Sequence, residues 1–154
     1  MKPDIKDMLR MAGIAPTPNR TLALESLGGR AAALTAGEIL RYVQARRALN
    51  KVTLYRILEL FVERGLVLKH SSGDRAFRYC LGGKRSGAVH CHAYCRLCGR
   101  MECLSAAGDA STLGALKQSL LADVENVEIR IDGVCERCLA DPDRERVDAP
   151  GGNH

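Results

Sequence analysis

The sequence predicts an α+β protein with an N-terminal winged helix-turn-helix domain and a small C-terminal α/β domain. Three observations lead to this fold class. Segments with helical periodicity come first and are followed by one β-hairpin pattern. A stretch of small and polar residues (81–89) then has the composition of a linker. Beyond it, two Cys-x-x-Cys pairs bracket a strand-helix-strand pattern.

Three helices are expected in the first part of the chain. Apolar spacing predicts helices over 4–13 and 19–27. A third helix begins at "TAGE", a capping box in which the Thr35 hydroxyl accepts a first-turn N–H and Glu38 reaches back to the N–H of Thr35. The buried side of this helix is formed by Ile39, Leu40 and Val43.

A fourth helix, over 51–64, has the clearest pattern in the chain. Asn50 is a plausible N-cap, and Gly65 is well placed to end the helix. Four apolar residues recur at i, i+3, i+4 and i+7, namely Leu54, Ile57, Leu58 and Phe61. This spacing predicts one buried face and one open face.

A β-hairpin completes the predicted winged helix. Its strands are expected over 66–70 and 75–80, on either side of the turn "SSGD". Basic residues of this wing are expected to follow a polyanion backbone: Lys69, Arg75 and Arg78.

The charge distribution indicates that only the first part of the chain meets a polyanion. Residues 1–80 contain 14 Lys/Arg and 7 Asp/Glu, whereas residues 81–154 contain 9 and 11, which gives the net charge of +5. In a helix-turn-helix, the N-terminal part of the second helix enters the major groove of DNA. The expected DNA contacts are Arg20, Lys51, Thr53, Tyr55 and Arg56.

The C-terminal domain is expected to contain three strands and one helix. The strands are predicted over 89–95, near 100–104 and over 126–131, and the helix near 110–122. The predicted organisation is therefore a DNA-binding domain (1–80), a hinge linker (81–89), a metal-binding domain (90–140) and a disordered tail (141–154).

Four of the seven cysteines form two tight-turn pairs. In a reducing cytosol such pairs are more often metal-binding than disulfide-bonded, and seven thiols cannot all pair within one chain. Two such turns complete a tetrahedral zinc site. The predicted structural zinc ligands are Cys95, Cys98, Cys135 and Cys138.

A second, regulatory metal site is expected around "HCH" (90–92). On a strand, His90 and His92 point to one face and Cys91 to the other, so Cys91 is interpreted as a small buried apolar residue. The expected ligands are His70, Cys80, His90 and His92, with Glu102 and Cys103 as alternatives. A thiolate with imidazoles favours Zn²⁺ over iron or manganese, and this site would tie the two domains together.

The motifs "TPNR" (17–20), "TLYRILELFVERGLV" (53–67), "HCHAYCRLCGR" and "CERC" (135–138) resemble those of the ferric uptake regulator family, and within it the zinc uptake regulators. The resemblance covers roughly residues 5–140. It implies a C-terminal α/β dimerisation domain and a homodimeric repressor that binds an AT-rich palindrome when metal-loaded. Carried over by position, it assigns DNA contacts to Tyr55 and Arg56. It likewise assigns metal sensing to Cys80, His90 and His92.

The sequence departs from the family pattern in two places. The longer His/Asp-rich run of iron sensors is absent. The usual acidic residue five places after the second knuckle cysteine is Cys103, with Glu102 one position earlier. The composition of the regulatory site therefore stays open between these two residues.

The predicted function is that of a zinc-responsive repressor that controls zinc homeostasis genes. An iron, manganese or peroxide sensor of the same family is the alternative, and a zinc-stabilised RNA-binding or adaptor module is a third. No enzymatic activity or small-molecule substrate is expected, since His90 lacks the H-x-E and P-C-x-x-C context of zinc deaminases. The charged N-terminus and the lack of a long apolar run predict a cytoplasmic protein without a membrane segment.

Overall fold

The computed structural model of the chain describes residues 4–28, 32–71, 76–82, 90–105, 118–120, 128–141 and 143. Its described residues divide into two compact units, the first up to residue 82 and the second from residue 90 onward. The exact domain boundaries expected from the sequence stay predictions.

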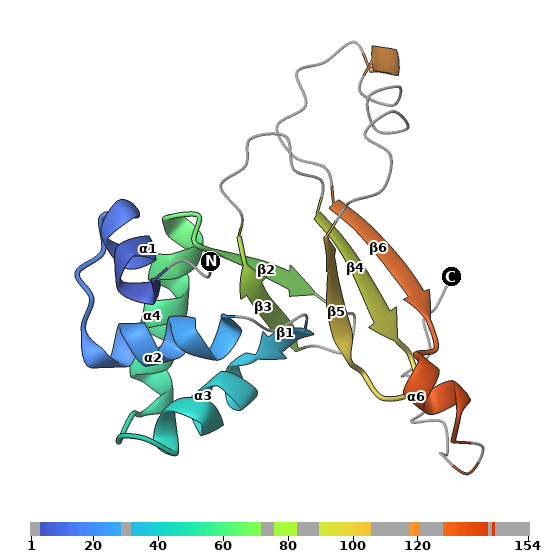
Figure 1. Cartoon of the computed structure of the whole chain (residues 1–154), viewed down its shortest axis with the longest axis horizontal. Helices are drawn as coiled ribbons and strands as arrows, with labels where there is room; N and C mark the ends of the chain where they lie inside the picture. The colour runs from blue at the N-terminus through green and yellow to red at the C-terminus, as the bar shows by residue number, and fades with distance from the viewer. Residues whose placement is uncertain are drawn as a thin grey trace. The chain divides into compact units, whose positions relative to one another are not determined.

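The first unit contains the four helices expected from the sequence (Figure 1). They are α1 (Ile5–Met11), α2 (Pro18–Leu27), α3 (Ala36–Gln44) and α4 (Lys51–Glu63). The capping box at α3 is confirmed: the Glu38 carboxylate accepts from the N–H of Thr35 at 2.7 Å, and the Thr35 hydroxyl accepts from the N–H of Glu38 at 3.3 Å.

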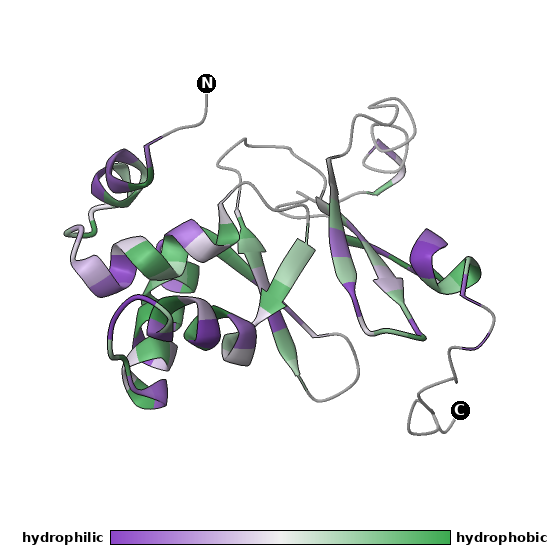
Figure 2. Cartoon of the chain, turned by 60° about the horizontal axis from the view of Figure 1, so that its bottom comes forward, coloured by the Kyte–Doolittle hydropathy of each residue, from purple (hydrophilic) through white to green (hydrophobic). Residues whose placement is uncertain are grey.

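The core of this unit lies where the apolar sides of the helices meet. Figure 2 shows that these helices contain both hydrophobic and hydrophilic residues. The four residues of the predicted α4 stripe are all buried, with Leu54 and Phe61 fully so. Burial of each such side chain contributes about 1.5–3 kcal/mol, which fixes which face of α4 remains open.

Both ends of α4 are set by local hydrogen bonds. The Asn50 side chain accepts from the N–H of Thr53 at 2.8 Å, as its predicted role as N-cap requires. At the other end Gly65 has a φ of 70°, and the next N–H, of Leu66, donates to the carbonyl of Phe61 at 2.9 Å. The chain can therefore turn directly into the next strand.

Three strands form an antiparallel sheet in the first unit: β1 (Ala32–Thr35), β2 (Val67–Ser71) and β3 (Phe77–Leu81). β3 is paired with both of the others. The hairpin of β2 and β3 confirms the predicted wing, whereas β1 was not predicted. Its turn residues 72–75, including Arg75, lie outside the described residues.

The expectation that Arg78 lies on the open surface of the wing is wrong. Arg78 lies on β3, between Thr35 of β1 and His70 of β2 in the strand register, and it is only 7% exposed. Lys69 is exposed as expected, with its ammonium 4.0 Å from the centre of the Phe77 ring. Lys69, and not Arg78, is therefore the accessible basic residue on the described part of the wing.

The second unit contains a three-stranded sheet and a short helix. The strands are β4 (His90–Cys95), β5 (Met101–Ser105) and β6 (Glu128–Gly133), and the helix is α6 (Glu136–Leu139). β4 pairs antiparallel with β5 and parallel with β6. A parallel pair needs a crossover, for which the sequence predicts a helix near 110–122. Only residues 118–120 of that segment are described, and residues 118 and 119 are helical.

The predicted fold class, α+β with an N-terminal winged helix and a C-terminal α/β domain, is confirmed. β6 ends two residues later than expected, and the short helix α6 was not predicted. Most of the predicted linker and the tail lie outside the described residues. Among the described residues, no helix has the length and apolar character that crossing a membrane requires.

Candidate functional site

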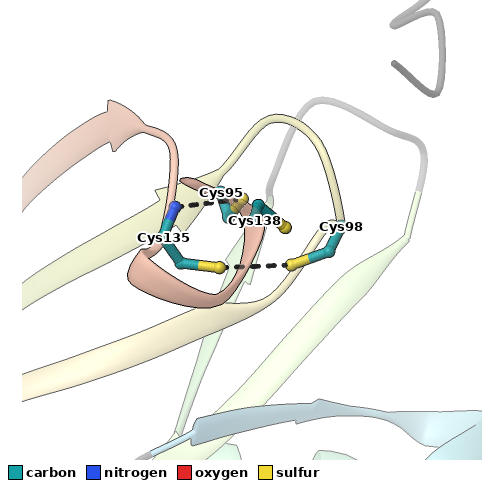
Figure 3. A group of neighbouring side chains, drawn as sticks. All are labelled: Cys95, Cys98, Cys135 and Cys138. Atoms are coloured by element: carbon teal, nitrogen blue, oxygen red, sulfur yellow. Dashed lines mark hydrogen bonds between the residues drawn. The ribbon is translucent and has the colours of Figure 1, made fainter. Parts of the chain in front are cut away.

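Four cysteines converge at one end of the second unit (Figure 3). Cys95 is the last residue of β4, and Cys98 lies in the turn that leads to β5. Cys135 follows β6 as the N-cap residue of α6, and Cys138 lies within α6. The two pairs, separated by 36 residues in the sequence, therefore meet at one place.

The spacing of these thiols fits a tetrahedral zinc ion. All four Sγ atoms lie within 4.8 Å of one another, and those of Cys98 and Cys135 are 3.8 Å apart. A Zn–S distance of about 2.3 Å places the sulfurs of a tetrahedral site about 3.8 Å apart. All seven cysteines are free thiols. The four residues therefore match a Cys₄ zinc site in ligand type, number and spacing.

Backbone hydrogen bonds favour the ionised form of one of these thiols. Burial raises the pKa of Cys95, but N–H groups of Cys135, Cys98 and Leu97 outweigh it and lower the pKa to about 6. The N–H of Cys135 donates to Cys95 Sγ at 3.3 Å. Burial raises the pKa of Cys98 as well, and together with the neighbouring thiols it raises that of Cys138 to about 12. A bound cation would therefore favour the thiolate forms of Cys98 and Cys138 beside that of Cys95.

The first knuckle depends on a glycine. Gly99 has a φ of 72°, and its N–H donates to the carbonyl of Cys95 at 2.8 Å. The N–H of Cys95 in turn donates to the carbonyl of Arg100 at 2.9 Å. A side chain at position 99 would strain this turn, so the Gly after "CRLC" is a sequence signal for the knuckle that the spacing of the cysteines alone does not include.

Two of the expected regulatory ligands meet within the first unit. His70 on β2 and Cys80 on β3 are both buried, and the His70 Nε2 atom lies 3.3 Å from Cys80 Sγ. Leu68 is the cross-strand partner of Cys80, so His70 lies two residues further along the same face. An imidazole nitrogen and a thiolate that share a tetrahedral zinc lie about 3.5 Å apart, which matches this pair.

The register of the second sheet separates the two alternative ligands. His92 on β4 is paired with Cys103 on β5, so these two side chains lie on the same face. Glu102 is paired with Ala93 and lies on the opposite face, where its carboxylate accepts from Arg100 Nε at 3.0 Å. The side chain of His90 lies outside the described part of the structure. Cys103, and not Glu102, is therefore on the face of His92.

Cys91 lies on the face of β4 that His92 does not occupy. Its pairing partner is Leu104, and it is half-buried rather than buried as expected. The strand geometry thus keeps Cys91 away from His92, in agreement with the alternation on which its exclusion from the metal sites was based.

The open face of α4 presents most of the residues expected to contact nucleic acid. Lys51, Tyr55 and Arg56 are exposed, and the Lys51 ammonium lies 5.9 Å from the centre of the Tyr55 ring. Thr53 is half-buried. Arg20 belongs to α2, is also half-buried, and donates to the carbonyl of Ala15 at 3.1 Å.

The family model of the ferric uptake regulator family matches residues 11–110. The peroxide operon regulator of Bacillus subtilis (strain 168) is 28% identical over 135 residues, which cover 86% of this chain and 89% of that protein. The structure of the Helicobacter pylori ferric uptake regulator is similar with a TM-score of 0.70 and 18% identity, covering 90% of this chain and 93% of the other. A zinc uptake regulator complexed with zinc and DNA has a TM-score of 0.62 and 20% identity, covering 88% and 90%.

These likenesses agree with the N-terminal winged helix and the C-terminal α/β unit described above. Because the family model covers well over half of the chain, the protein belongs to the ferric uptake regulator family, whose members are metal-responsive, DNA-binding transcription regulators.

Proposed function

We propose that this protein is a zinc-responsive repressor that binds promoter DNA as a zinc-loaded homodimer and controls zinc homeostasis genes in the cytoplasm. Regulation by metal follows from the family. The choice of zinc, the homodimer, the repressor role and an AT-rich palindromic operator are our proposals.

The observation that supports the choice of zinc is that, in each unit, a cysteine among the regulatory residues is paired with a histidine. Cys80 lies beside His70, and Cys103 is the cross-strand partner of His92. Thiolate and imidazole ligands suit Zn²⁺, whereas sites richer in oxygen suit iron or manganese. Glu102 supplies no oxygen on that face, since it lies on the other side of the sheet.

The two metal sites have different roles in this proposal. All four ligands of the Cys₄ site belong to the second unit and leave no open position, as in structural zinc sites. We expect the four ligands of the regulatory zinc to come from five residues, His70 and Cys80 of the first unit and His90, His92 and Cys103 of the second. Zinc bound at this site would fix the orientation of the first unit, which binds DNA, relative to the second unit of the same chain.

Binding of zinc and binding of operator DNA are then thermodynamically linked. If zinc favours the arrangement in which both recognition helices of the homodimer fit successive major-groove faces, zinc and operator raise each other's affinity by the same factor. The DNA is contacted by four residues of α4, namely Lys51, Thr53, Tyr55 and Arg56. Arg20 of α2 adds a further DNA contact.

A pair of adjacent substitutions tests the assigned ligands. Operator affinity is measured during a titration with buffered Zn²⁺, for a duplex that the zinc-loaded protein selects from a random-sequence pool. Cys103→Ser should raise the zinc concentration needed for half-maximal binding at least about tenfold. Glu102→Gln changes the neighbouring residue on the other face and should leave that concentration unchanged. The reverse pattern would assign the ligand to Glu102 and contradict the sulfur-based choice of zinc.

The named relatives include a peroxide regulator and a ferric uptake regulator, which favours a second candidate function, a sensor of iron, manganese or peroxide. Under that function, Fe²⁺ or Mn²⁺ rather than Zn²⁺ would promote operator binding in the same titration. A zinc-stabilised adaptor or RNA-binding module would select no duplex at all.

A further inference from the structure

A long stretch of the first unit carries positive charge without compensation. Residues 39–58 contain five basic residues and no Asp or Glu. They cover most of α3, the turn and the first half of α4. The basic residues are Arg41, Arg46, Arg47, Lys51 and Arg56, and all five are exposed. Such a surface attracts a polyanion.

Arg46 has a structural role that accounts for its charge. It follows the C-terminus of α3, where cations are favourable. Its guanidinium donates to the carbonyl of Tyr42 at 2.9 Å and lies 3.8 Å from the centre of the Tyr42 ring. Arg46 is thus held back against α3, as a side-chain cap of that helix.

Arg47 has no such role. It is exposed, and among the side chains that the structure describes none forms a hydrogen bond or ion pair with its guanidinium. Its backbone, in contrast, is firmly placed, because its N–H donates to the carbonyl of Val43 at 3.0 Å. Leu49 is buried in the core, and its carbonyl accepts from Gln44 Nε2 at 2.9 Å. The turn therefore holds Arg47 at a fixed place, three residues before the N-cap of α4.

We infer that Arg47 binds a DNA backbone phosphate at the edge of the groove that α4 enters. This inference rests on the proposed function. In a helix-turn-helix, the first helix crosses the backbone while the second lies in the major groove, so the turn between them passes over the phosphates. An anchored turn with an exposed guanidinium suits this position, since arginine binds phosphate through two parallel N–H donors. Such a contact sets the register of the protein but reads no base.

Salt dependence measures the contact directly. The affinity of the zinc-loaded full-length protein for its selected duplex is measured at salt concentrations from about 50 to about 300 mM, which lie on either side of physiological ionic strength. Each neutralised phosphate contributes about −0.9 to the slope of log affinity against log salt. Arg47→Ala should therefore reduce the slope by about 0.9 for each protomer bound, whereas Arg47→Lys, which keeps the charge, should restore most of it.

Two variants that remove the same charge serve as controls. Arg46→Ala removes the charge next to Arg47, and Lys6→Ala removes the charge of an exposed lysine on α1. Neither substitution should reduce the slope by more than about a third of the Arg47→Ala effect. Arg47→Ala should weaken binding to a scrambled duplex and to the selected duplex by the same factor. Arg56→Ala should instead lower the ratio of the affinity for the selected duplex to the affinity for the scrambled one.

The outcomes separate this inference from the proposed function. If the wild type binds its selected duplex with zinc but Arg47→Ala keeps the wild-type slope, the phosphate contact is refuted and the proposed repressor function stands. Equal slopes for Arg46→Ala and Arg47→Ala refute it too, because the effect is then the diffuse charge of the turn. If zinc does not promote binding of the wild type, the proposed function itself fails.

Discussion

Removal of zinc from the Cys₄ site should unfold the second unit while the first stays folded. Among the described residues, the apolar core cluster contains 18 buried side chains, and all of them belong to the first unit. Among the described residues of the second unit, the buried hydrophobic side chains are Cys95, Met101 and Cys138. Burial of one methionine contributes about 1.5–3 kcal/mol, whereas structural zinc contributes about 10–16 kcal/mol. Zinc binding thus outweighs the burial of the described apolar side chains around the site.

Cys138→Ser makes this test specific for the structural site, because Cys138 is not a regulatory ligand. Hydrogen exchange followed by mass spectrometry should show protection in β4, β5 and β6 reduced about a hundredfold or more, since each 1.4 kcal/mol or so is a factor of ten. Peptides of α4 should be unaffected. Cys91→Ser, a matched change at a half-buried thiol outside both sites, should have little effect. Unchanged protection in β4–β6 of the Cys138→Ser protein would refute the reasoning.

Substitutions at four further positions test how the first unit is built. Asn50→Ala removes the acceptor for the N–H of Thr53 and should lower the free energy of unfolding by about 1 kcal/mol in a denaturant titration, whereas Asn50→Asp should preserve it. Gly65→Ala places a side chain at a φ of 70° and should destabilise by about 1 kcal/mol, although nothing lies within 4 Å of the added carbon. Gly37→Ala, within α3 and also uncrowded, should stabilise by about 0.5–1 kcal/mol, and the same sign for both glycines would contradict the backbone argument. Phe61→Ala should cost about 3–5 kcal/mol in the same titration, because Phe61 is fully buried, and a loss below about 1 kcal/mol would show that the core rearranges around it.

Local patterns were sufficient for the four helices of the first unit and for the grouping of the four cysteines. The α4 stripe and the Asn50 cap depend on residues close in sequence, and the structure agrees with both. The Cys-x-x-Cys turns likewise place two thiols by local geometry, so the spacing indicates the site although 36 residues separate the pairs.

Features that depend on strand pairing could not be predicted in the same way. β1 has only four residues, and its pairing with β3 is with residues more than 40 positions away. That pairing makes β3 a central strand, which is why Arg78 is buried although its local context resembles an exposed hairpin. The choice between Glu102 and Cys103 also needed the β4–β5 register, because neighbouring residues on a strand lie on opposite faces.

The central claim is that zinc controls operator binding by this protein. The most direct test is the affinity of the wild-type protein for its selected duplex, measured by fluorescence anisotropy at buffered free Zn²⁺, Fe²⁺ and Mn²⁺ with the Cys₄ site kept loaded. Zinc should increase the affinity by about 5- to 150-fold, the usual range of allosteric coupling, and the His90→Ala/His92→Ala protein should lose this response. An affinity that is the same with and without zinc, or that rises only with Fe²⁺ or Mn²⁺, would contradict the account.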